Sequence, residues 1–137
     1  MIVSDKAPEP VGPYPHARRV GNLLFLSGVG PRQKGTKEIP GAVLNEKGEV
    51  IKKDIEAQCR SVFQNVKTIL EASGSSWEQL VDVTVFLTHM KEDFPVYNSV
   101  YREYFPDPAT QPCRTTVEVG ALPTPIAIEL KCVAVIS

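Results

Sequence analysis

The chain has 137 residues, of which 42% are hydrophobic and 23% are charged, an ordinary balance for a globular protein. That length predicts a single domain over residues 1–137. The 15 basic and 16 acidic residues leave a net charge of −1, which does not favour a nucleic-acid partner. The longest apolar run near the N-terminus, 23–26, is too short for a membrane span or a signal core, so we expect no membrane partner and a cytoplasmic location.

Cysteines and histidines give no metal-binding pattern. The cysteines are Cys59, Cys113 and Cys132. Their odd number and the absence of C-x-x-C spacing argue against a disulfide framework and a zinc site, and His16 and His89 lack ligand spacing too. We therefore expect no metal and no cofactor. Cys59 and Cys132 fall in apolar stretches and are expected in the core, which leaves Cys113 as the thiol that stands out.

The first third of the chain predicts short strands and turns. Residues 1–15 are rich in proline and are expected to be irregular. Gly21-Asn22 lies between two candidate strands, 17–20 and 23–27, and predicts a hairpin. Glycines and prolines punctuate residues 28–53, with another hairpin expected around Lys47-Gly48. Lysines in this region lie among acids and are expected to be solvated: Lys34, Lys37, Lys47, Lys52 and Lys53.

A helix is predicted after Asp54, which can act as its N-cap. Gly74 is expected to end it, and Ser76 with Gln79 is spaced like the capping box of a further short turn. The apolar residues at helical spacing are Ile55, Cys59, Val62, Phe63, Val66, Ile69 and Leu70.

Residues 81–87 alternate in polarity and predict a strand with one buried face. The residues expected on that face are Val81, Val83, Val85 and Leu87.

Asp93 and Pro95 are expected to start a second helix as its N-cap and first-turn proline. The residues expected on its inner side are Phe94, Tyr97, Tyr101, Tyr104 and Phe105. Two further strands, 114–119 and 126–136, complete the pattern. The order of elements predicts an α+β fold with a single mixed sheet and two helices on one face.

Arg114 and Glu129 are the two residues that could carry chemistry. Arg114 opens a strand after a proline-bounded loop and shares a face with Thr116 and Glu118, and a guanidinium suits a carboxylate held by two hydrogen bonds. For an isolated arginine, a surface salt bridge is the commoner role. Glu129 interrupts an apolar strand, which requires either a partner for the carboxylate or a task such as activating water. These residues alone do not choose between an enzyme and a binding module.

The segment from Arg114 to Glu129, RTTVEVGALPTPIAIE, resembles the signature of the Rid (YjgF-type) family of enamine and imine deaminases. That signature has an arginine, a valine-rich strand, a Leu-Pro turn and a closing glutamate. Other stretches resemble the family in the same order along the chain: Gly12-Pro13-Tyr14, Leu26-Ser27-Gly28, Gln64-Asn65-Val66, and Tyr97-Asn98-Ser99-Val100-Tyr101 with Tyr104-Phe105.

The resemblance implies a role for each matching residue. Arg114 would grip the substrate carboxylate, and Glu129 would hold the water that attacks the C=N carbon. The pocket would be lined by Tyr14, the backbone of Gly28 and of Thr116, and Asn98. The family resemblance also implies a homotrimer with sites in the clefts between subunits; trimers could pair into hexamers.

Two features depart from the compact family members. The family often has cysteine at the place of Thr116. The stretch 28–54 is longer, and its pieces Gly30-Pro31-Arg32 and Glu38-Ile39-Pro40-Gly41 look like the 2-aminomuconate deaminase branch. That branch implies hydrolysis of 2-aminomuconate to 4-oxalocrotonate and ammonia, with Arg32 as a candidate for binding a second carboxylate.

Three alternatives remain open. The first is a broad hydrolase of 2-imino acids and enamines, and the second is a ligand-binding trimer without catalysis. Retention of both Arg114 and Glu129 favours catalysis, because a binder needs only the arginine. The third, RNA cleavage or translation inhibition, fits poorly with the acidic charge balance and the lack of a basic stripe.

Overall fold

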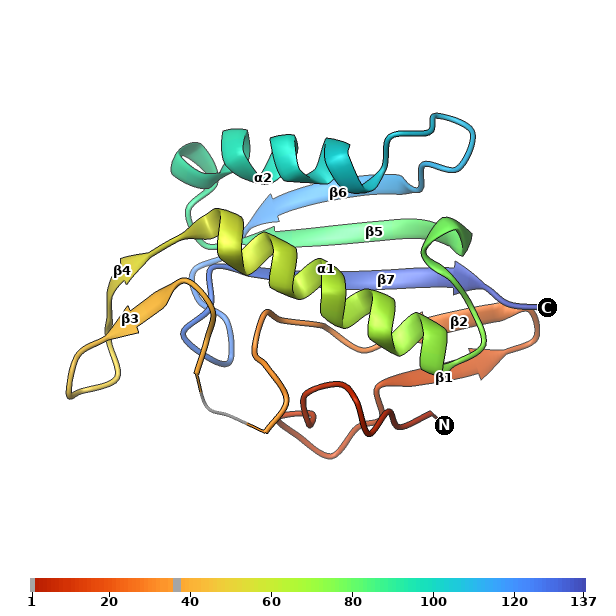
Figure 1. Cartoon of the computed structure of the whole chain (residues 1–137), viewed down its shortest axis with the longest axis horizontal. Coiled ribbons are helices and arrows are strands. Elements are labelled where there is room, and N and C mark those ends of the chain that lie inside the picture. Colours follow the sequence, from red (N-terminus) through yellow and green to blue (C-terminus); the bar gives the residue numbers. More distant parts are fainter. Residues whose placement is uncertain (1, 36–37) are drawn as a thin grey trace.

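Two helices lie on one face of a five-stranded mixed sheet in the computed structural model of the chain (Figure 1). The structure describes residues 2–35 and 38–137, so Lys37 lies outside the described part. The elements are β1 (Ala17–Val20), β2 (Leu23–Leu26), β3 (Ala42–Leu44), β4 (Val50–Lys53), α1 (Ile55–Ala72), η1 (Trp77–Gln79), β5 (Leu80–Leu87), α2 (Met90–Tyr104), β6 (Cys113–Glu118) and β7 (Ile128–Val135). The predicted fold class is confirmed.

The sheet has the strand order β1-β2-β7-β5-β6, and β3 pairs with β4 in a separate two-stranded sheet. β5 and β6 run parallel, whereas the other neighbouring pairs are antiparallel. Both predicted hairpins form, β1–β2 around Gly21 and β3–β4 around Gly48, and both glycines have positive φ. This order places β6, which carries Arg114, at one edge of the sheet under α2, and β7, which carries Glu129, at its centre (Figure 1).

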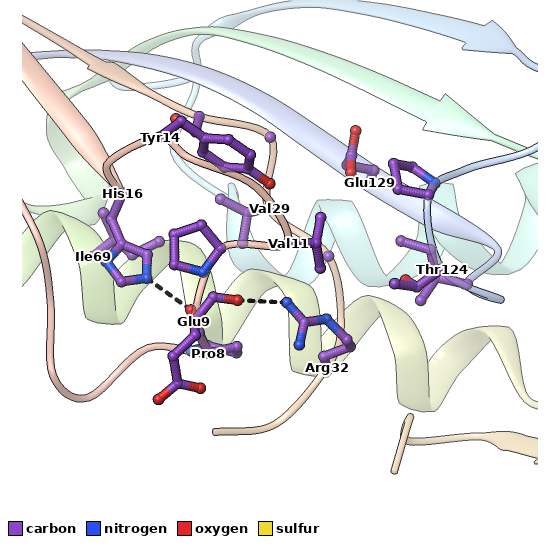
Figure 2. A pocket seen from close by; sticks show the side chains of 16 residues that line it. Pro8, Glu9, Val11, Tyr14, His16, Val29, Arg32, Ile69, Thr124 and Glu129 are labelled. Atoms are coloured by element: carbon purple, nitrogen blue, oxygen red, sulfur yellow. Dashed lines mark hydrogen bonds between the residues drawn. The ribbon is translucent and has the colours of Figure 1, made fainter. Parts of the chain in front are cut away.

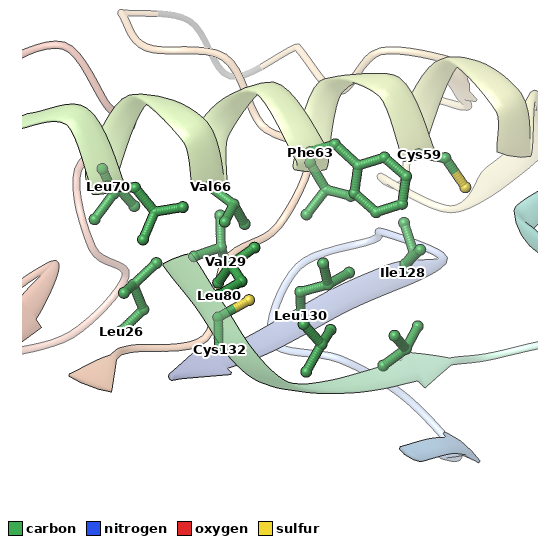
Figure 3. Packing of buried hydrophobic residues seen from close by; sticks show 14 of the residues in the cluster. Leu26, Val29, Cys59, Phe63, Val66, Leu70, Leu80, Ile128, Leu130 and Cys132 are labelled. Carbon is green, nitrogen blue, oxygen red and sulfur yellow. The ribbon is translucent and has the colours of Figure 1, made fainter. Parts of the chain in front are cut away.

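Helix α1 covers the centre of the sheet with the apolar stripe predicted from its spacing. Every member of that stripe is buried, from Ile55 to Leu70. The Asp54 carboxylate caps the helix by accepting from the Ala57 N–H at 3.3 Å, and Gly74 follows the last turn with φ of +85°. Figure 3 shows α1 side chains packed over the strands below. Full burial of such side chains stabilises the fold by roughly 1.5–3 kcal/mol each.

The helix-facing side of the sheet continues this core. In β7, Ile128, Leu130, Cys132 and Ala134 alternate toward the helices and are fully buried. Cys59 is buried as well, and burial raises the pKa of both the Cys59 and the Cys132 thiol to about 12. Both cysteines are therefore inert core residues, as predicted.

Strand β5 differs from the prediction at its start. It begins at Leu80, and its register against β7 shifts between Leu80 and Asp82. This bulge turns Val81 outward, so Val81 is 39% exposed and Leu80 takes the buried position. Val83, Val85 and Leu87 are buried as predicted.

Helix α2 begins at Met90, earlier than the predicted start at Asp93. The Glu118 carboxylate of β6 accepts from the Met90 N–H at 2.8 Å and so caps the helix from a distant part of the chain. Asp93 is instead buried in the first turns and forms an ion pair with Lys53, with 2.5 Å between Nζ and Oδ2. The expectation that Lys53 is solvated is therefore wrong.

Two smaller expectations also change. The Ser76 hydroxyl donates to the Gln79 side chain at 3.0 Å and makes no capping bond to the backbone. Strand β7 begins at Ile128, because residues 126 and 127 still belong to the preceding loop. Within the described part of the chain, no helix is long and apolar enough to cross a membrane.

The face of the sheet away from the helices carries partly exposed apolar side chains. Leu23 and Phe25 of β2, Val117 of β6 and Val135 of β7 are each 36–40% exposed. We call these four residues the open-face patch. Burying this much apolar surface against another molecule would be favourable.

Candidate functional site

Glu129 points away from the helices, into a pocket beside the N-terminal segment. It lies opposite Phe86 in the β5–β7 register, whereas the neighbouring residues Ile128 and Leu130 face the core. The pocket has a volume of about 60 Å³. Its walls come from residues 8–11, 14 and 16, residues 27–30 with Arg32, Ile69 of α1, and the loop residues 123, 124 and 126 (Figure 2).

Gly28 lets the Glu129 carboxylate approach the backbone closely. A Cβ atom at position 28 would lie 2.9 Å from Glu129 Oε2 and 3.0 Å from its Cδ. Either distance is shorter than real Cβ contacts, so a side chain here would displace the carboxylate. The structure thus places Gly28, a residue expected to line the pocket, directly beside Glu129.

The Glu129 carboxylate has neither an ion pair nor a hydrogen bond to another side chain or to the backbone within the described residues. Burial raises its pKa above the ordinary value of glutamic acid. A half-buried carboxylate without a partner is unfavourable unless it has a task. Such a group has the raised proton affinity of a general base and can hold a water molecule in the pocket.

Tyr14 and Arg32 line the same pocket, as Figure 2 shows. The phenol ring of Tyr14 is 39% exposed. Arg32 donates from Nη2 to the backbone oxygen of Glu9 at 2.7 Å. A guanidinium has five N–H donors, so this bond leaves donors that can meet an anionic group in the pocket.

His16 secures the N-terminal wall of the pocket, a role that its sequence position did not indicate. It is only 6% exposed. Its Nδ1 accepts from the Ser4 N–H at 2.8 Å, so the ring proton is on Nε2, which donates to the Pro8 oxygen at 2.7 Å (Figure 2). This pair of bonds fixes the neutral tautomer and holds residues 4–8 against the sheet.

Arg114 lies elsewhere, between β6 and α2. Its Nη1 donates to Asn98 Oδ1 at 2.8 Å, which joins two of the residues expected in the substrate site. The guanidinium carbon stacks over the Tyr101 and Tyr97 rings, 4.7 and 5.4 Å from their centres. Such cation–π contacts stabilise a positive charge at the surface and leave further N–H donors for a carboxylate ligand.

Thr116 stands next to Arg114 on the same face of β6, as the alternation predicted. Its hydroxyl is buried, as are those of Tyr97 and Tyr101, and none of the three has a hydrogen-bond partner within residues 2–35 and 38–137. Burial raises the pKa of Tyr97, while Thr116 and the Arg114 guanidinium act to lower it.

The Arg114 group and the Glu129 group are on opposite faces of the sheet. Arg114 lies opposite Val83, which points to the helices, and Glu129 lies opposite Phe86, which points to the other side. Within one chain the structure therefore brings Glu129 together with Tyr14, Gly28 and Arg32, and separately brings Arg114 together with Asn98 and Thr116. The Arg114 group can bind a carboxylate, whereas the Glu129 group can hold a water molecule and accept a proton.

In the described ranges 2–35 and 38–137, no three histidine, cysteine, aspartate or glutamate side chains gather as candidate metal ligands. Two further arginines, Arg18 and Arg19, lie on β1 outside the pocket lining, which leaves Arg32 as the arginine that lines the pocket among the described residues.

Comparison with known proteins places the chain among small proteins of the same size and fold. A family model described as Endoribonuclease L-PSP matches residues 4–136. A RutC family protein of Pyrococcus abyssi is 40% identical, with 98% of this chain and 94% of the relative covered. A 2-iminobutanoate/2-iminopropanoate deaminase of Dermatophagoides farinae is 33% identical, with 99% and 95% covered. The crystal structure of E. coli TdcF with bound serine has a TM-score of 0.83 and 33% identity, with 100% and 99% covered.

Proposed function

The chain belongs to the Rid (YjgF-type) family, also described as Endoribonuclease L-PSP, and from this premise we propose that it hydrolyses an imine or enamine that carries a carboxylate. Relatives with deaminase names support a hydrolytic deaminase of this general kind. The observation that carries the proposal is the Glu129 carboxylate, half-buried beside Gly28 with a raised pKa and no partner in the described residues. A net charge of −1 gives no support to RNA as the substrate.

The reaction uses few groups, because an imine carbon is already electrophilic. Arg114 holds the carboxylate next to the C=N carbon through paired hydrogen bonds. Glu129 orients a water molecule and accepts one of its protons while the water oxygen bonds to the carbon. Glu129 passes this proton to the nitrogen, which gives the carbinolamine. The carbinolamine hydroxyl then gives up its proton to the nitrogen, the C–N bond breaks, and ammonia leaves as the C=O bond of the 2-oxo acid forms. An enamine substrate first tautomerises to the imine.

The complete site is proposed to form between two copies of the chain. Arg114 and Glu129 face opposite sides of the sheet, so one protomer's Arg114 group would meet the Glu129 pocket of its neighbour. The open-face patch supplies apolar surface for such an assembly, which the family resemblance implies is a homotrimer. Positioning both reactants at the shared cleft would account for several kcal/mol of the barrier.

Two substrate classes fit this site. A small 2-imino acid, such as the compounds in the name of the D. farinae relative, requires one cationic contact, which Arg114 provides. 2-Aminomuconate carries two carboxylates and requires a second contact. Arg32 supports this narrower proposal, because it lines the Glu129 pocket and retains free N–H donors.

Ammonia release tests the proposal. The wild-type chain and the Arg114→Ala and Glu129→Gln variants would be assayed on freshly generated 2-aminomuconate and on 2-iminobutanoate. We expect turnover by the wild type on at least one of the two and a loss of about a hundredfold or more in either variant. The relative kcat/KM of the wild type on the two compounds decides between the narrow and the broad substrate class. Unchanged turnover in both variants would contradict the proposal.

A further inference from the structure

Three buried hydroxyl groups gather beside the Arg114 guanidinium. They belong to Tyr97 and Tyr101 of α2 and to Thr116 of β6, and none has a hydrogen-bond partner among the described residues. Tyr97 is fully buried and Tyr101 is 8% exposed. Buried hydroxyls are nearly always hydrogen-bonded, because an unpaired one costs free energy. A cluster of three around one charged group therefore points to a role that involves that group.

Tyr97 is the member of this cluster that links the other groups. Its ring lies 5.4 Å from the guanidinium carbon, and Thr116 and Arg114 both act to lower the pKa of its hydroxyl. Tyr101 differs: its ring is closer to the guanidinium carbon, at 4.7 Å, but Thr116 is not among the groups that shift the pKa of its hydroxyl. The Tyr97 hydroxyl is thus near both the guanidinium and the Thr116 hydroxyl.

We propose that the Tyr97 and Thr116 hydroxyls form a buried hydroxyl pair that fixes the Arg114 guanidinium when it binds the substrate carboxylate. Two N–H groups of the guanidinium then face the carboxylate, and another donates to the Tyr97 oxygen. The Tyr97 hydroxyl in turn donates to Thr116 Oγ1. No bond other than hydrogen bonds changes, and the Tyr97 and Thr116 hydroxyls each gain a hydrogen-bond partner. Tyr97 is a positioning residue in this arrangement, because it acts through Arg114 and does not touch the substrate.

Because it is buried, this hydroxyl pair can hold the guanidinium more strongly than Asn98 does. The Arg114–Asn98 bond is at the surface, where water competes for both partners. The Tyr97 hydroxyl is out of reach of water, and hydrogen bonds to a charge are stronger in such surroundings. The inference rests on the proposed function, since it assumes that Arg114 binds the carboxylate.

The test measures carboxylate binding and stability separately. Binding of 2-oxobutanoate would be followed by titration calorimetry, and unfolding by Tm, in Tyr97→Phe, Thr116→Val, Thr116→Ser and the Tyr97→Phe/Thr116→Val double variant. Tyr104→Phe is the matched control, because it removes a hydroxyl from the same helix outside the cluster. Arg114→Ala reports on the proposed function itself.

We expect Kd to rise about tenfold in Tyr97→Phe, which loses a hydrogen bond to a charged group, and about threefold in Thr116→Val, which loses a hydrogen bond between neutral groups. In the double variant, the increase in Kd is expected to be smaller than the product of the two single increases, because both hydroxyls act in one connected set of hydrogen bonds. Thr116→Ser keeps the hydroxyl and restores binding, and Tyr104→Phe binds as the wild type does. The Tm of Tyr97→Phe is expected to stay the same or rise, because an unpaired buried hydroxyl is removed.

The contrary results separate the two ideas. Wild-type affinity in Tyr97→Phe, alongside lost binding in Arg114→Ala, would overturn the proposed role of the hydroxyl pair and leave the role of Arg114 intact. A fall in the Tm of Tyr97→Phe together with its affinity would also overturn it, because the hydroxyl would then be structural. Wild-type affinity in Arg114→Ala would remove both proposals.

Discussion

The Glu129 carboxylate lies against the backbone of Gly28, with Oε2 only 2.9 Å from the place that a Cβ atom would occupy. The contact joins the strand end after β2 to the central strand β7, at the base of the pocket. It explains why a residue without a side chain is required at this point, although its backbone conformation is ordinary.

Gly28→Ala is predicted to lower kcat by about tenfold or more while leaving Tm nearly unchanged. The new methyl group would displace the end of a flexible side chain and no backbone atom, so the fold can adapt, but the water-holding carboxylate moves. Gly120→Ala is the control, because no described atom lies within 4 Å of its Cβ position. A variant at position 28 with wild-type kcat would show that the placement of Glu129 is not critical.

Glu129→Gln is predicted to raise the free energy of unfolding at pH 7 to 8. Burial raises the pKa of Glu129 in the folded chain, so the protonated form is favoured there and its contribution to stability is lost as pH rises through the folded pKa. A neutral glutamine avoids this loss. The gain over wild type should disappear below about pH 4, where glutamic acid is protonated in the unfolded chain too. Urea unfolding of the variant and the wild type across this pH range measures the difference in the free energy of unfolding. A gain that does not depend on pH would contradict the explanation.

His16→Ala is predicted to destabilise the chain by about 1–3 kcal/mol and to raise KM. The substitution leaves the buried Ser4 N–H without its acceptor and releases Pro8, so the N-terminal wall of the pocket loosens. Urea unfolding and limited proteolysis within residues 2–15 would report the two effects. His89→Ala serves as the control, because His89 is exposed and its ring is hydrogen-bonded only to Thr88 among the described residues. Equal sensitivity of both variants to protease would refute the role of His16.

Arg32→Ala is predicted to raise KM for 2-aminomuconate by about tenfold and to change KM for 2-iminobutanoate much less. The reason is that only the first substrate has a second carboxylate for the guanidinium in the Glu129 pocket. Steady-state kinetics on both compounds provide the comparison. Equal changes in both KM values would remove Arg32 from substrate recognition and favour the broad imine hydrolase.

Local signals in the sequence were sufficient for much of the fold. The spacing of seven apolar residues predicted the buried face of α1, and Gly21-Asn22 predicted the first hairpin. The start of α2 was missed because its cap is Glu118, which is remote in sequence. The outward position of Val81 was missed because a bulge depends on how β5 pairs with β7.

The site was predictable only in its parts. Alternation along β6 placed Arg114 and Thr116 on one face, which the structure confirms. Alternation cannot relate Arg114 to Glu129, because their relative orientation depends on the register of both strands against β5. His16 and Tyr97 were missed as well, since their neighbours come from other parts of the chain.

The most direct test of the account is complementation between two inactive variants. Arg114→Ala and Glu129→Gln chains with different tags would be co-expressed, and assemblies that carry both tags would be purified and assayed for ammonia release. A site shared between neighbours predicts that each mixed trimer regains about one intact site in three, although each variant alone is inactive. Mixed assemblies that remain as inactive as their parents would contradict the shared site and the function built on it.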